Sequence, residues 1–539
     1  MQLKNKRKEY KKMKRIILAL VIIITTITAA GCGGNKIQQE SSIKTPVGQY
    51  PVECDDTLTY WVGYSGLASQ GVSNFSELPY FDWLKEETGI NVQYIHPVVG
   101  QENEQLNIML ASGEYYDIIE RDFYNFQGGP EGAIKDGYII RLNDVIDKYA
   151  PNLKAYLKKH PEIDKMVKTD EGSYYCFPFI RGDKLLNTYQ GPVIREDLLK
   201  KTGLDVPETV DEWETMLRAF KDMGVKKPFS VAFSNWNKSA IFMGAYNIRK
   251  GFYVEDGVVK YGEYEDSYKD FLTRMNKWYN EGLLDSDIAS VDQKTIDSKM
   301  VSGDIATTVA NTMSGLGTYV MPGRKNNPEY NLIPAPYPVL KKGDKCNFSQ
   351  MTLAYSSFGS PAITTQCKNV ELAARLLDYG YSEEGQLMMN FGREGESYNM
   401  VDGYPRYSEV IMNNKDGLSP SEAKNYFTYP PGSGPYIQDR RVMEQMAITD
   451  EQKRSLEIWA DTNAEKYLLP PITHTVEETE EITSIQNDIN TYVNEMYYKF
   501  IVGVEPLDRF DEYQKQLEAL GIKKLLEVKQ NAYERYINR

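Results

Sequence analysis

Two short runs, TLTYWV at residues 57–62 and INVQYI at residues 90–95, decide the fold of this chain. Both are rich in β-branched and aromatic residues, which is typical of strands. Residues 78–88 and 101–112 have the apolar spacing of helices, and a glycine that can stop a helix follows each of them. With a short apolar strand at residues 117–119, strands and helices alternate, which predicts an α/β fold with a parallel sheet covered on both faces.

The loops after these strands are candidate ligand-binding loops, because ligands bind beyond the carboxyl ends of parallel strands. The loops are residues 63–71 and 120–129. Aromatic and charged side chains at these strand ends suit a sugar, whose C–H faces pack on rings and whose hydroxyls bond to polar groups. The candidates are Trp61, Tyr64, Arg121, Asp122 and Tyr124.

Further candidates lie in polar or glycine-rich loops, where functional residues concentrate. Residues 235–237 read NWN after an apolar run, another candidate follows a predicted strand at residues 305–310, and residues 392–398 form a glycine-rich turn. Each candidate has a structural alternative as a core residue, a surface ion pair or a turn brace. The candidates in these loops are Asn235, Trp236, Asn311, Glu394, Glu396 and Tyr398.

Other segments predict structure only. Thr209 and Glu212 have the spacing of a capping box at the start of a helix. Helices are expected at residues 268–280 and 370–379, and two more from about residues 477 and 510, which must bury their apolar face on a preceding lobe. The helix after Thr209 has a stripe with the spacing of a buried face: Trp213, Met216, Leu217 and Phe220.

The start of the chain predicts export. The first 15 residues hold eight basic residues and one acidic residue, and an apolar run at residues 16–27 follows, which is typical of a secretory signal peptide. That run is shorter than the roughly 20 residues that span a bilayer, so a retained membrane anchor is the weaker alternative.

Residues 29–32, AAGC, resemble a lipobox, although Ala29 stands where leucine is usual. The resemblance implies that residues 1–31 are a lipoprotein signal peptide and that Cys32 becomes a lipid-carrying N-terminus; cleavage nearby, with Cys32 unmodified, is the alternative. Residues 32–50 then read as a flexible tether, since they are polar and rich in glycine.

The charge of the 539-residue chain argues against nucleic acid as a partner. The formal charge is −14, and it is near −21 without the basic first 15 residues. The four cysteines after Cys32 match no metal-ligand spacing. Cys346 and Cys367 could form a disulfide outside the cell, or all four could be free thiols, the other two being Cys54 and Cys176.

Three segments resemble the family 1 extracellular solute-binding proteins, in the same order along the chain. Residues 191–199, GPVIREDLL, resemble the entry to the second lobe; residues 300–306, MVSGDIA, resemble a short lead-in strand, with Asp304 where lysine is usual. Residues 379–386, YGYSEEGQ, resemble the last helix of the first lobe. The resemblance covers essentially the whole mature chain and is strongest for the large lipoproteins of the LipO or YtcQ type.

This resemblance implies a type II periplasmic-binding-protein-like fold, with two hinged α/β lobes and a helical C-terminal extension. We expect residues 51–185 plus 355–410 to form lobe 1. Residues 186–354 plus 411–539 would form lobe 2, which includes the C-terminal helices. Closure around the ligand would be a hinge motion.

The resemblance also implies the function. We expect an extracellular lipoprotein, anchored through Cys32 to the outer face of a gram-positive cell membrane, that captures a carbohydrate for an ABC importer in the cleft between its two lobes. Its partners would be the sugar and the ABC permease subunits. The length of the two candidate ligand-binding loops favours an oligosaccharide as that sugar. The protein would be a monomer without a cofactor or metal.

The motifs do not favour an enzyme. No H-E-x-x-H, G-x-S-x-G or Walker A motif occurs in the sequence. Three alternatives stay open: a peptide-binding lipoprotein of the same fold, a lipid-anchored glycosidase that uses two carboxylates, and a sensor or adhesin that binds glycans.

Overall fold

The computed structural model of the protein describes residues 43–64, 67 and 70–539, and Thr45–Arg539 form one compact unit. The predicted signal peptide, Cys32 and most of the predicted tether lie outside the described residues. Within the compact unit, Arg375 donates a 2.7 Å hydrogen bond to the Thr45 carbonyl and accepts one at 2.6 Å from the Tyr50 hydroxyl through its own carbonyl. Residues 45–50 therefore already contact the folded body.

The first sheet confirms the predicted alternation of strands and helices. Its order is β12-β3-β1-β2, in which β1 pairs in parallel with β2 and β3, while β12 is an antiparallel edge strand. Gly89 ends α3 with a φ of 70°, and a Cβ there would lie 2.4 Å from the Val52 carbonyl oxygen, so only glycine fits. The bounds are β1 Thr57–Val62, β2 Asn91–Ile95, β3 Ile118–Glu120, β12 Pro361–Ile363, α3 Pro79–Thr88 and α4 Glu102–Ser112.

The second sheet has the order β10-β5-β9-β6, with β6 parallel to β9 and the other pairs antiparallel. Helix α10, Val210–Asp222, begins with the predicted capping box between Thr209 and Glu212, and the predicted stripe on it is buried. The strands are β5 Gln190–Arg195, β6 Lys227–Phe229, β9 Ile305–Asn311 and β10 Leu332–Pro334.

Three short strands lie where the chain passes between these sheets. β4, Phe179–Arg181, leads from the first sheet to β5, and β11, Tyr355–Ser356, leads from β10 back to β12. β4 pairs with β11 and also with β15, Ile437–Gln438. These strands are the candidate hinge.

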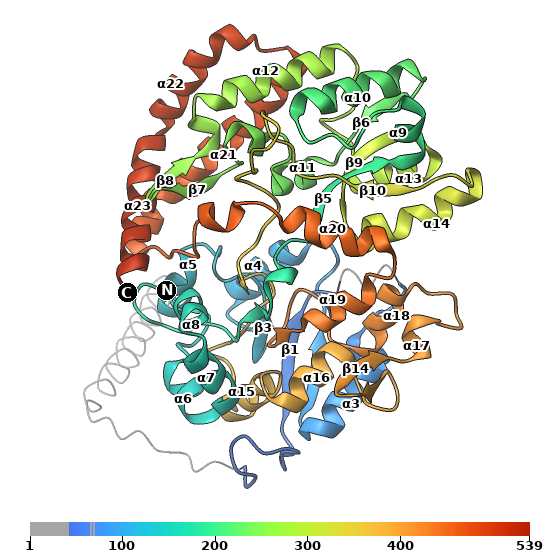
Figure 1. The fold of residues 1–539 in the computed structure, drawn as a ribbon. Coiled ribbons are helices and arrows are strands. Elements are labelled where there is room, and N and C mark those ends of the chain that lie inside the picture. The colour runs from blue at the N-terminus through green and yellow to red at the C-terminus, as the bar shows by residue number, and fades with distance from the viewer. Residues whose placement is uncertain (1–42, 65–66, 68–69) are drawn as a thin grey trace, which may run out of the picture. The chain divides into compact units, whose positions relative to one another are not determined.

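The C-terminal helices confirm the predicted helical layer (Figure 1). Ile489, Val493 and Phe500 of α21 are each at most 1% exposed and belong to the core around the second sheet. Helix α21 packs on α12 and α23, and α23 packs on β8. The bounds are α12 Ser267–Asn280, β8 Val258–Tyr261, α21 Val476–Val502, α22 Phe510–Leu520 and α23 Ile522–Asn538.

A small body of helices and one hairpin packs beside the first sheet. Helix α18 contacts both α3 and α17, and α16 contacts β14 and β15. Its elements are α16 Glu383–Phe391, β13 Tyr398–Val401, β14 Tyr404–Tyr407, α17 Glu409–Met412, α18 Pro420–Phe427 and α19 Arg440–Met446.

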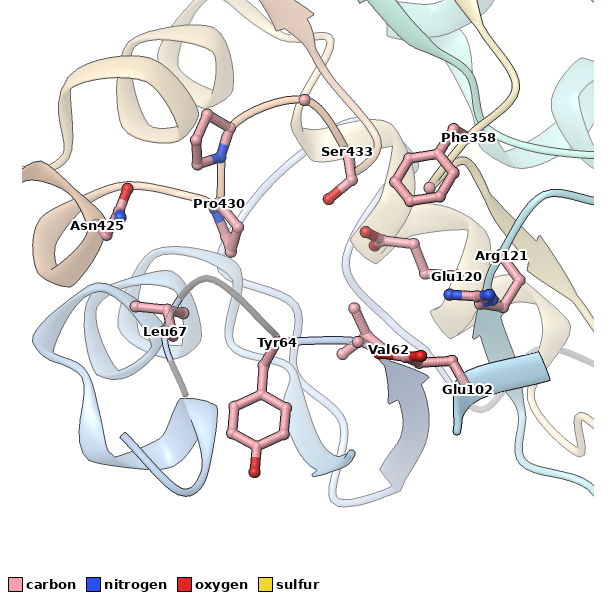
Figure 2. Close-up of a pocket in the computed structure, with 14 residues that line it drawn as sticks. Val62, Tyr64, Leu67, Glu102, Glu120, Arg121, Phe358, Asn425, Pro430 and Ser433 are labelled. Atoms are coloured by element: carbon pink, nitrogen blue, oxygen red, sulfur yellow. The ribbon is translucent and has the colours of Figure 1, made fainter. Parts of the chain in front are cut away.

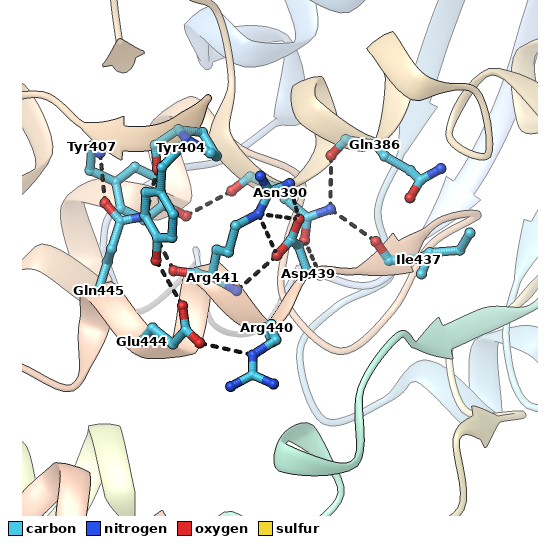
Figure 3. A network of polar contacts seen from close by, with 11 residues as sticks. Gln386, Asn390, Tyr404, Tyr407, Ile437, Asp439, Arg440, Arg441, Glu444 and Gln445 are labelled. Carbon is cyan, nitrogen blue, oxygen red and sulfur yellow. Dashed lines mark hydrogen bonds and ion pairs between the residues drawn. The ribbon is translucent and has the colours of Figure 1, made fainter. Parts of the chain in front are cut away.

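A polar network joins this body (Figure 3). The Asn390 side chain donates to the Ile437 carbonyl at 2.9 Å and accepts from the Asp439 backbone at 2.9 Å. Tyr407 donates to the Asn390 carbonyl at 2.7 Å, and Arg441 bonds to Asp439 at 2.9 Å. Residues 411–446, which the predicted boundaries assign to lobe 2, thus make these contacts with elements near the first sheet. The lobe boundaries themselves stay a prediction.

One expectation differs from the structure, and one alternative that was left open is decided. Residues 233–239 form helix α11, Phe233–Ser239, rather than the predicted polar loop, and Trp236 on it is 0% exposed. Cys346 and Cys367 are both free and buried, as is Cys176, so the pairing considered for the first two does not occur. Within the described ranges, no helix has the length and apolar character needed to cross a membrane.

The remaining longer elements connect these parts. They are α5 Gly129–Lys135, α6 Asn143–Tyr149, α7 Pro151–Lys159, α8 Pro161–Val167, α9 Glu196–Thr202, β7 Phe252–Glu255, α13 Gln293–Ser302, α14 Gly317–Asn326, α15 Val370–Tyr379 and α20 Asp450–Ala460.

Candidate ligand-binding site

A pocket of about 390 Å³ opens at the carboxyl ends of β1 and β3, where the sequence predicted a site (Figure 2). One side is built by the loops after these two strands, and the other by the segment after α18. We call it the strand-end pocket. Its lining residues are Val62, Gly63, Tyr64, Leu67, Glu102, Glu120, Arg121, Phe358, Gly359, Asn425, Pro430, Pro431, Gly432 and Ser433.

Glu120 is the most constrained polar group of the strand-end pocket. It is the last residue of β3 and is 3% exposed. Its Oε2 atom accepts hydrogen bonds from the Tyr60 hydroxyl at 2.6 Å and the Tyr429 hydroxyl at 2.7 Å, and its carboxyl group points toward Ser433 (Figure 2).

Burial raises the pKa of Glu120 to about 7, although the hydroxyls of Tyr60, Tyr429 and Ser433 oppose that rise. A carboxylate offers about four acceptor positions, and these three hydroxyls occupy three of them. Glu120 therefore keeps an acceptor position for a ligand in the pocket.

Two aromatic side chains, Tyr64 and Phe358, line the pocket with this acid. Phe358 is 61% exposed, and the Tyr64 ring lies 4.6 Å from the ring of His96, centroid to centroid. His96 is fixed by two bonds, from Nδ1 to the Val62 carbonyl at 2.8 Å and from the Phe75 backbone N–H to Nε2 at 3.1 Å. Burial lowers the pKa of His96, so a neutral ring supports Tyr64.

Arg121 supplies a cation at the same strand end. Its Nη2 atom donates to Asn103 at 2.5 Å, and Glu102 lies close enough to favour its charged form. Burial lowers the pKa of Arg121. Arg121 and Glu102 both line the pocket, which gives it a donor group and a second acid.

The opposite wall, residues 430–433, comes from a distant part of the chain. At one end of this wall, the Tyr429 hydroxyl donates a hydrogen bond to Glu120. At the other end, the Gly434 N–H donates a 2.8 Å hydrogen bond to the Gly359 carbonyl. A Cβ on Gly359 would lie 2.3 Å from the Cβ of Ser433, so the wall approaches too closely for any other residue. Glu120 thus also positions the wall opposite it.

The structure brings two of the predicted residues, Tyr64 and Arg121, into this pocket. Asp122 instead braces a turn, where it accepts from the Asn125 side chain at 2.7 Å. Tyr124 donates to the Ile472 carbonyl at 2.6 Å and lines a different pocket. Trp61, at 3% exposed, lies in the sheet.

The later candidates lie outside the strand-end pocket. The Trp236 side chain is enclosed in the core and donates to the Ile241 carbonyl at 3.3 Å, so the prediction that it offers a face to a ligand is wrong. Tyr398 is 4% exposed and packs on Phe391.

Four candidates retain polar groups at or near the surface. Asn235 bonds to Gln293, Asn311 accepts from Gln190 at 3.1 Å, and Glu394 and Glu396 are exposed. A ligand-binding role for these four stays a prediction.

Sequence reasoning missed the most constrained group of the pocket. Glu120 follows the apolar residues 118–119 and is the first residue of the candidate loop 120–129. A carboxylate at this strand end was the signal in the sequence that could have identified it. Phe358, Asn425 and Ser433 carry no such signal, because only the folded chain brings them to this edge. Within the described ranges no group of three or more His, Cys, Asp or Glu side chains is placed to hold a metal.

The sequence is similar to two known bacterial proteins, to one of them over nearly its whole length. The chain is 24% identical over 547 residues to the fructooligosaccharide ABC transporter substrate-binding protein FusA of Streptococcus pneumoniae serotype 4, with 96% of this chain and 97% of FusA covered. It is 26% identical over 380 residues to lipoprotein LipO of Bacillus subtilis, with 66% of this chain and 71% of LipO covered.

Solved structures share the fold. Alginate-binding protein AlgQ2 without calcium ion has a TM-score of 0.74 at 24% identity, over 89% of this chain and 98% of AlgQ2. FusA of S. pneumoniae in complex with kestose has a TM-score of 0.73 at 23% identity, over 90% of this chain and 100% of that one. These likenesses confirm the predicted two-lobe, type II periplasmic-binding-protein-like fold.

Residues 72–387, more than half of the chain, match the sequence profile described as bacterial extracellular solute-binding protein. The resemblance predicted from the sequence is therefore confirmed, and the chain belongs to the bacterial extracellular solute-binding protein family.

Proposed function

We propose that the protein is the substrate-binding component of an ABC importer and captures a carbohydrate in the strand-end pocket without changing it chemically. The observation that carries this proposal is the Glu120 carboxyl group, which is buried at the end of β3 and borders a pocket that also exposes Phe358 and Tyr64. An acceptor beside aromatic faces matches the two surfaces of a sugar ring.

In this proposal each side of the sugar has a partner. The C–H face packs on Tyr64 and Phe358, while hydroxyls donate to Glu120 and accept from Arg121. The pocket volume of about 390 Å³ falls within the range of small-molecule sites. It is more than twice the roughly 150 Å³ of a cavity that holds benzene, which supports a ligand of more than one ring.

The relatives support a carbohydrate ligand. FusA is named for fructooligosaccharides and has been solved with kestose, and AlgQ2 is named for alginate. These names describe oligomeric sugars, and they favour the same class of ligand for this chain over a peptide.

The proposal extends to transport. Lobe 1 (51–185 plus 355–410) and lobe 2 (186–354 plus 411–539) would close about the strands β4, β11 and β15, and the closed monomer would bind the ABC permease subunits. A lipid on Cys32 would hold the protein at the extracellular face of the cell membrane. Both the lobe boundaries and the anchor are parts of this proposal.

A thermal-shift screen of the purified protein against neutral mono- and oligosaccharides, with short peptides in parallel, tests the proposal. A ligand at about 100 times its Kd adds about 2.7 kcal/mol to the free energy of unfolding. We expect at least one oligosaccharide to raise the Tm and to be recovered uncleaved by chromatography. Stabilisation by peptides alone, or cleavage of the sugar, would contradict it.

A further inference from the structure

A second pocket, of about 190 Å³, lies apart from the strand-end pocket, against the C-terminal helices. The loop after β3 forms one side and contributes Tyr124 and Phe126; the residues before α21 contribute His474; and α23 contributes Lys529. We call it the C-terminal pocket. Its lining shares no residue with that of the strand-end pocket.

Lys529 lacks the partner that a partly buried ammonium group normally has. It forms no hydrogen bond and no ion pair with any residue that the structure describes. The Lys529 Nζ atom lies over the ring of Phe252, 5.2 Å from the ring centroid. Burial lowers the pKa of Lys529 to about 8, so the group is mostly charged at neutral pH and poorly compensated.

His474 also lines this pocket and carries an unsatisfied buried atom. Its Nε2 atom is buried and has no hydrogen-bond partner among the described residues. Burial, together with the charges of Lys529 and Arg535, lowers the pKa of His474 to about 3. The ring is neutral at pH 7, and it adds no positive charge beside Lys529.

Two acids near the C-terminal pocket, Glu478 and Asp170, are already paired with arginines. Arg535 bonds to Glu478 at 2.8 Å and to Asp170 at 2.7 Å, and Arg539 bonds to Asp170 at 3.1 Å. Neither acid reaches Lys529. Lys529 is therefore a cation that neither of these acids pairs with, and it lies beside a neutral imidazole.

The size and the remaining surface restrict the occupant. A volume of about 190 Å³ exceeds the roughly 150 Å³ that accommodates benzene, which leaves room for one six-membered ring and not for a chain. Phe126 supplies an aromatic surface, whereas the Tyr124 hydroxyl is already bonded to the Ile472 carbonyl. Gln486 and Asn487 add side-chain amides at the lining.

We infer that the C-terminal pocket is a second binding site, which takes a single-ring solute that carries a carboxylate, such as an acidic monosaccharide. The carboxylate pairs with the Lys529 ammonium group, and the ring lies against Phe126. This assignment stands on residues outside the strand-end pocket and does not depend on the function proposed for that pocket.

Calorimetric titration of the purified protein at pH 7 tests the inference with three probes. Glucuronate carries the ring and the carboxylate, glucose carries a matching ring without charge, and inorganic phosphate carries charge without a ring. We expect glucuronate to bind at least about tenfold more tightly than either control. A hydrogen bond to a charged group changes the affinity by about that factor.

The variants localise the binding. Lys529→Gln and Lys529→Met each remove the ammonium group at similar side-chain length, and each should weaken glucuronate about tenfold or more. Lys523→Gln, on the same helix and 68% exposed, is the matched control and should bind as the wild type does. The inference is overturned if no glucuronate binds at millimolar concentration, if glucose or phosphate binds equally well, or if both Lys529 variants keep the wild-type affinity.

Discussion

The strand-end pocket and the core around Trp236 contain the same kinds of aromatic side chain and expose them very differently. Phe358 of the pocket is 61% exposed, whereas Trp236 is 0% exposed and meets Phe229 and Phe271 edge-on. The pocket ring stands beside the Glu120 carboxyl, whereas the polar atom of Trp236 is bonded within the core. An enclosed aromatic residue thus stabilises the fold, and one held at the surface beside a polar group can meet a ligand.

Trp236→Ala should have the largest effect, and that effect should be on stability. Removal of a fully enclosed tryptophan leaves a cavity, and we expect a loss of about 3–5 kcal/mol in the free energy of unfolding. Chemical denaturation of the unliganded protein measures it. Trp83→Ala, at a partly buried tryptophan, is the control and should lose clearly less. Equal losses of unfolding free energy in the two variants would contradict the distinction between the enclosed and the partly exposed aromatic residues.

Glu120→Gln should act mainly on binding. It replaces a carboxyl group that is partly ionised at pH 7 with a neutral amide of the same shape, and a hydrogen bond to a charged group contributes about 1.5–3 kcal/mol. Glycan affinity measured by calorimetry should fall about 10- to 100-fold. Glu114→Gln, at an exposed glutamate shortly before β3, should leave the affinity unchanged. An unaltered affinity in Glu120→Gln would remove this residue from the site.

Lys424→Met should stabilise the protein. Lys424 lies on α18 beside the pocket wall and is 6% exposed; it donates one hydrogen bond, at 3.0 Å to Thr428, and forms no ion pair with any described residue. Burial lowers the pKa of Lys424 to about 8. Replacement of this uncompensated ammonium should raise the free energy of unfolding by about 2 kcal/mol at pH 7.

The pH dependence identifies the cause of that gain. Between about pH 8 and the unfolded value near pH 10.4, the unfolded chain binds more protons at Lys424 than the folded chain does, so wild-type stability should rise with pH in that window. The advantage of Lys424→Met should therefore shrink from pH 7 to pH 10. Lys415→Met, at an exposed lysine, should stay within about 0.5 kcal/mol of the wild type, and a constant advantage would refute the electrostatic explanation.

Phe358→Ala should have the smallest effect on stability and a selective one on binding. Since most of this side chain is exposed, the free energy of unfolding should change by no more than about 0.5 kcal/mol. Loss of one aromatic face should weaken glycan binding by about 0.5–1.5 kcal/mol. Calorimetry beside denaturation measures both, and a loss of stability without a loss of affinity would place Phe358 with the core residues instead.

Much of the fold could be predicted from local sequence. The strand at Thr57–Val62, the helix at Val370–Tyr379 and the capping box at Thr209 each follow from residues that are neighbours in the chain. The strand-end location of the pocket also followed, because parallel strands place their following loops together.

The particular residues of the site could not be predicted to the same extent. Trp236 was nominated for its polar neighbours, Asn235 and Asn237, yet helix α11 turns the indole inward, and side chains on a helix point in different directions from residue to residue. The wall at residues 430–433 reaches Glu120 from about 300 residues away, through a tyrosine bond that no local pattern encodes.

The most direct test of the account is a crystal structure of the protein with an oligosaccharide that binds in solution. We predict that a sugar hydroxyl lies within hydrogen-bond distance of the Glu120 carboxyl and that a sugar ring packs on Phe358 or Tyr64. A sugar bound elsewhere, with the strand-end pocket empty, would contradict the account.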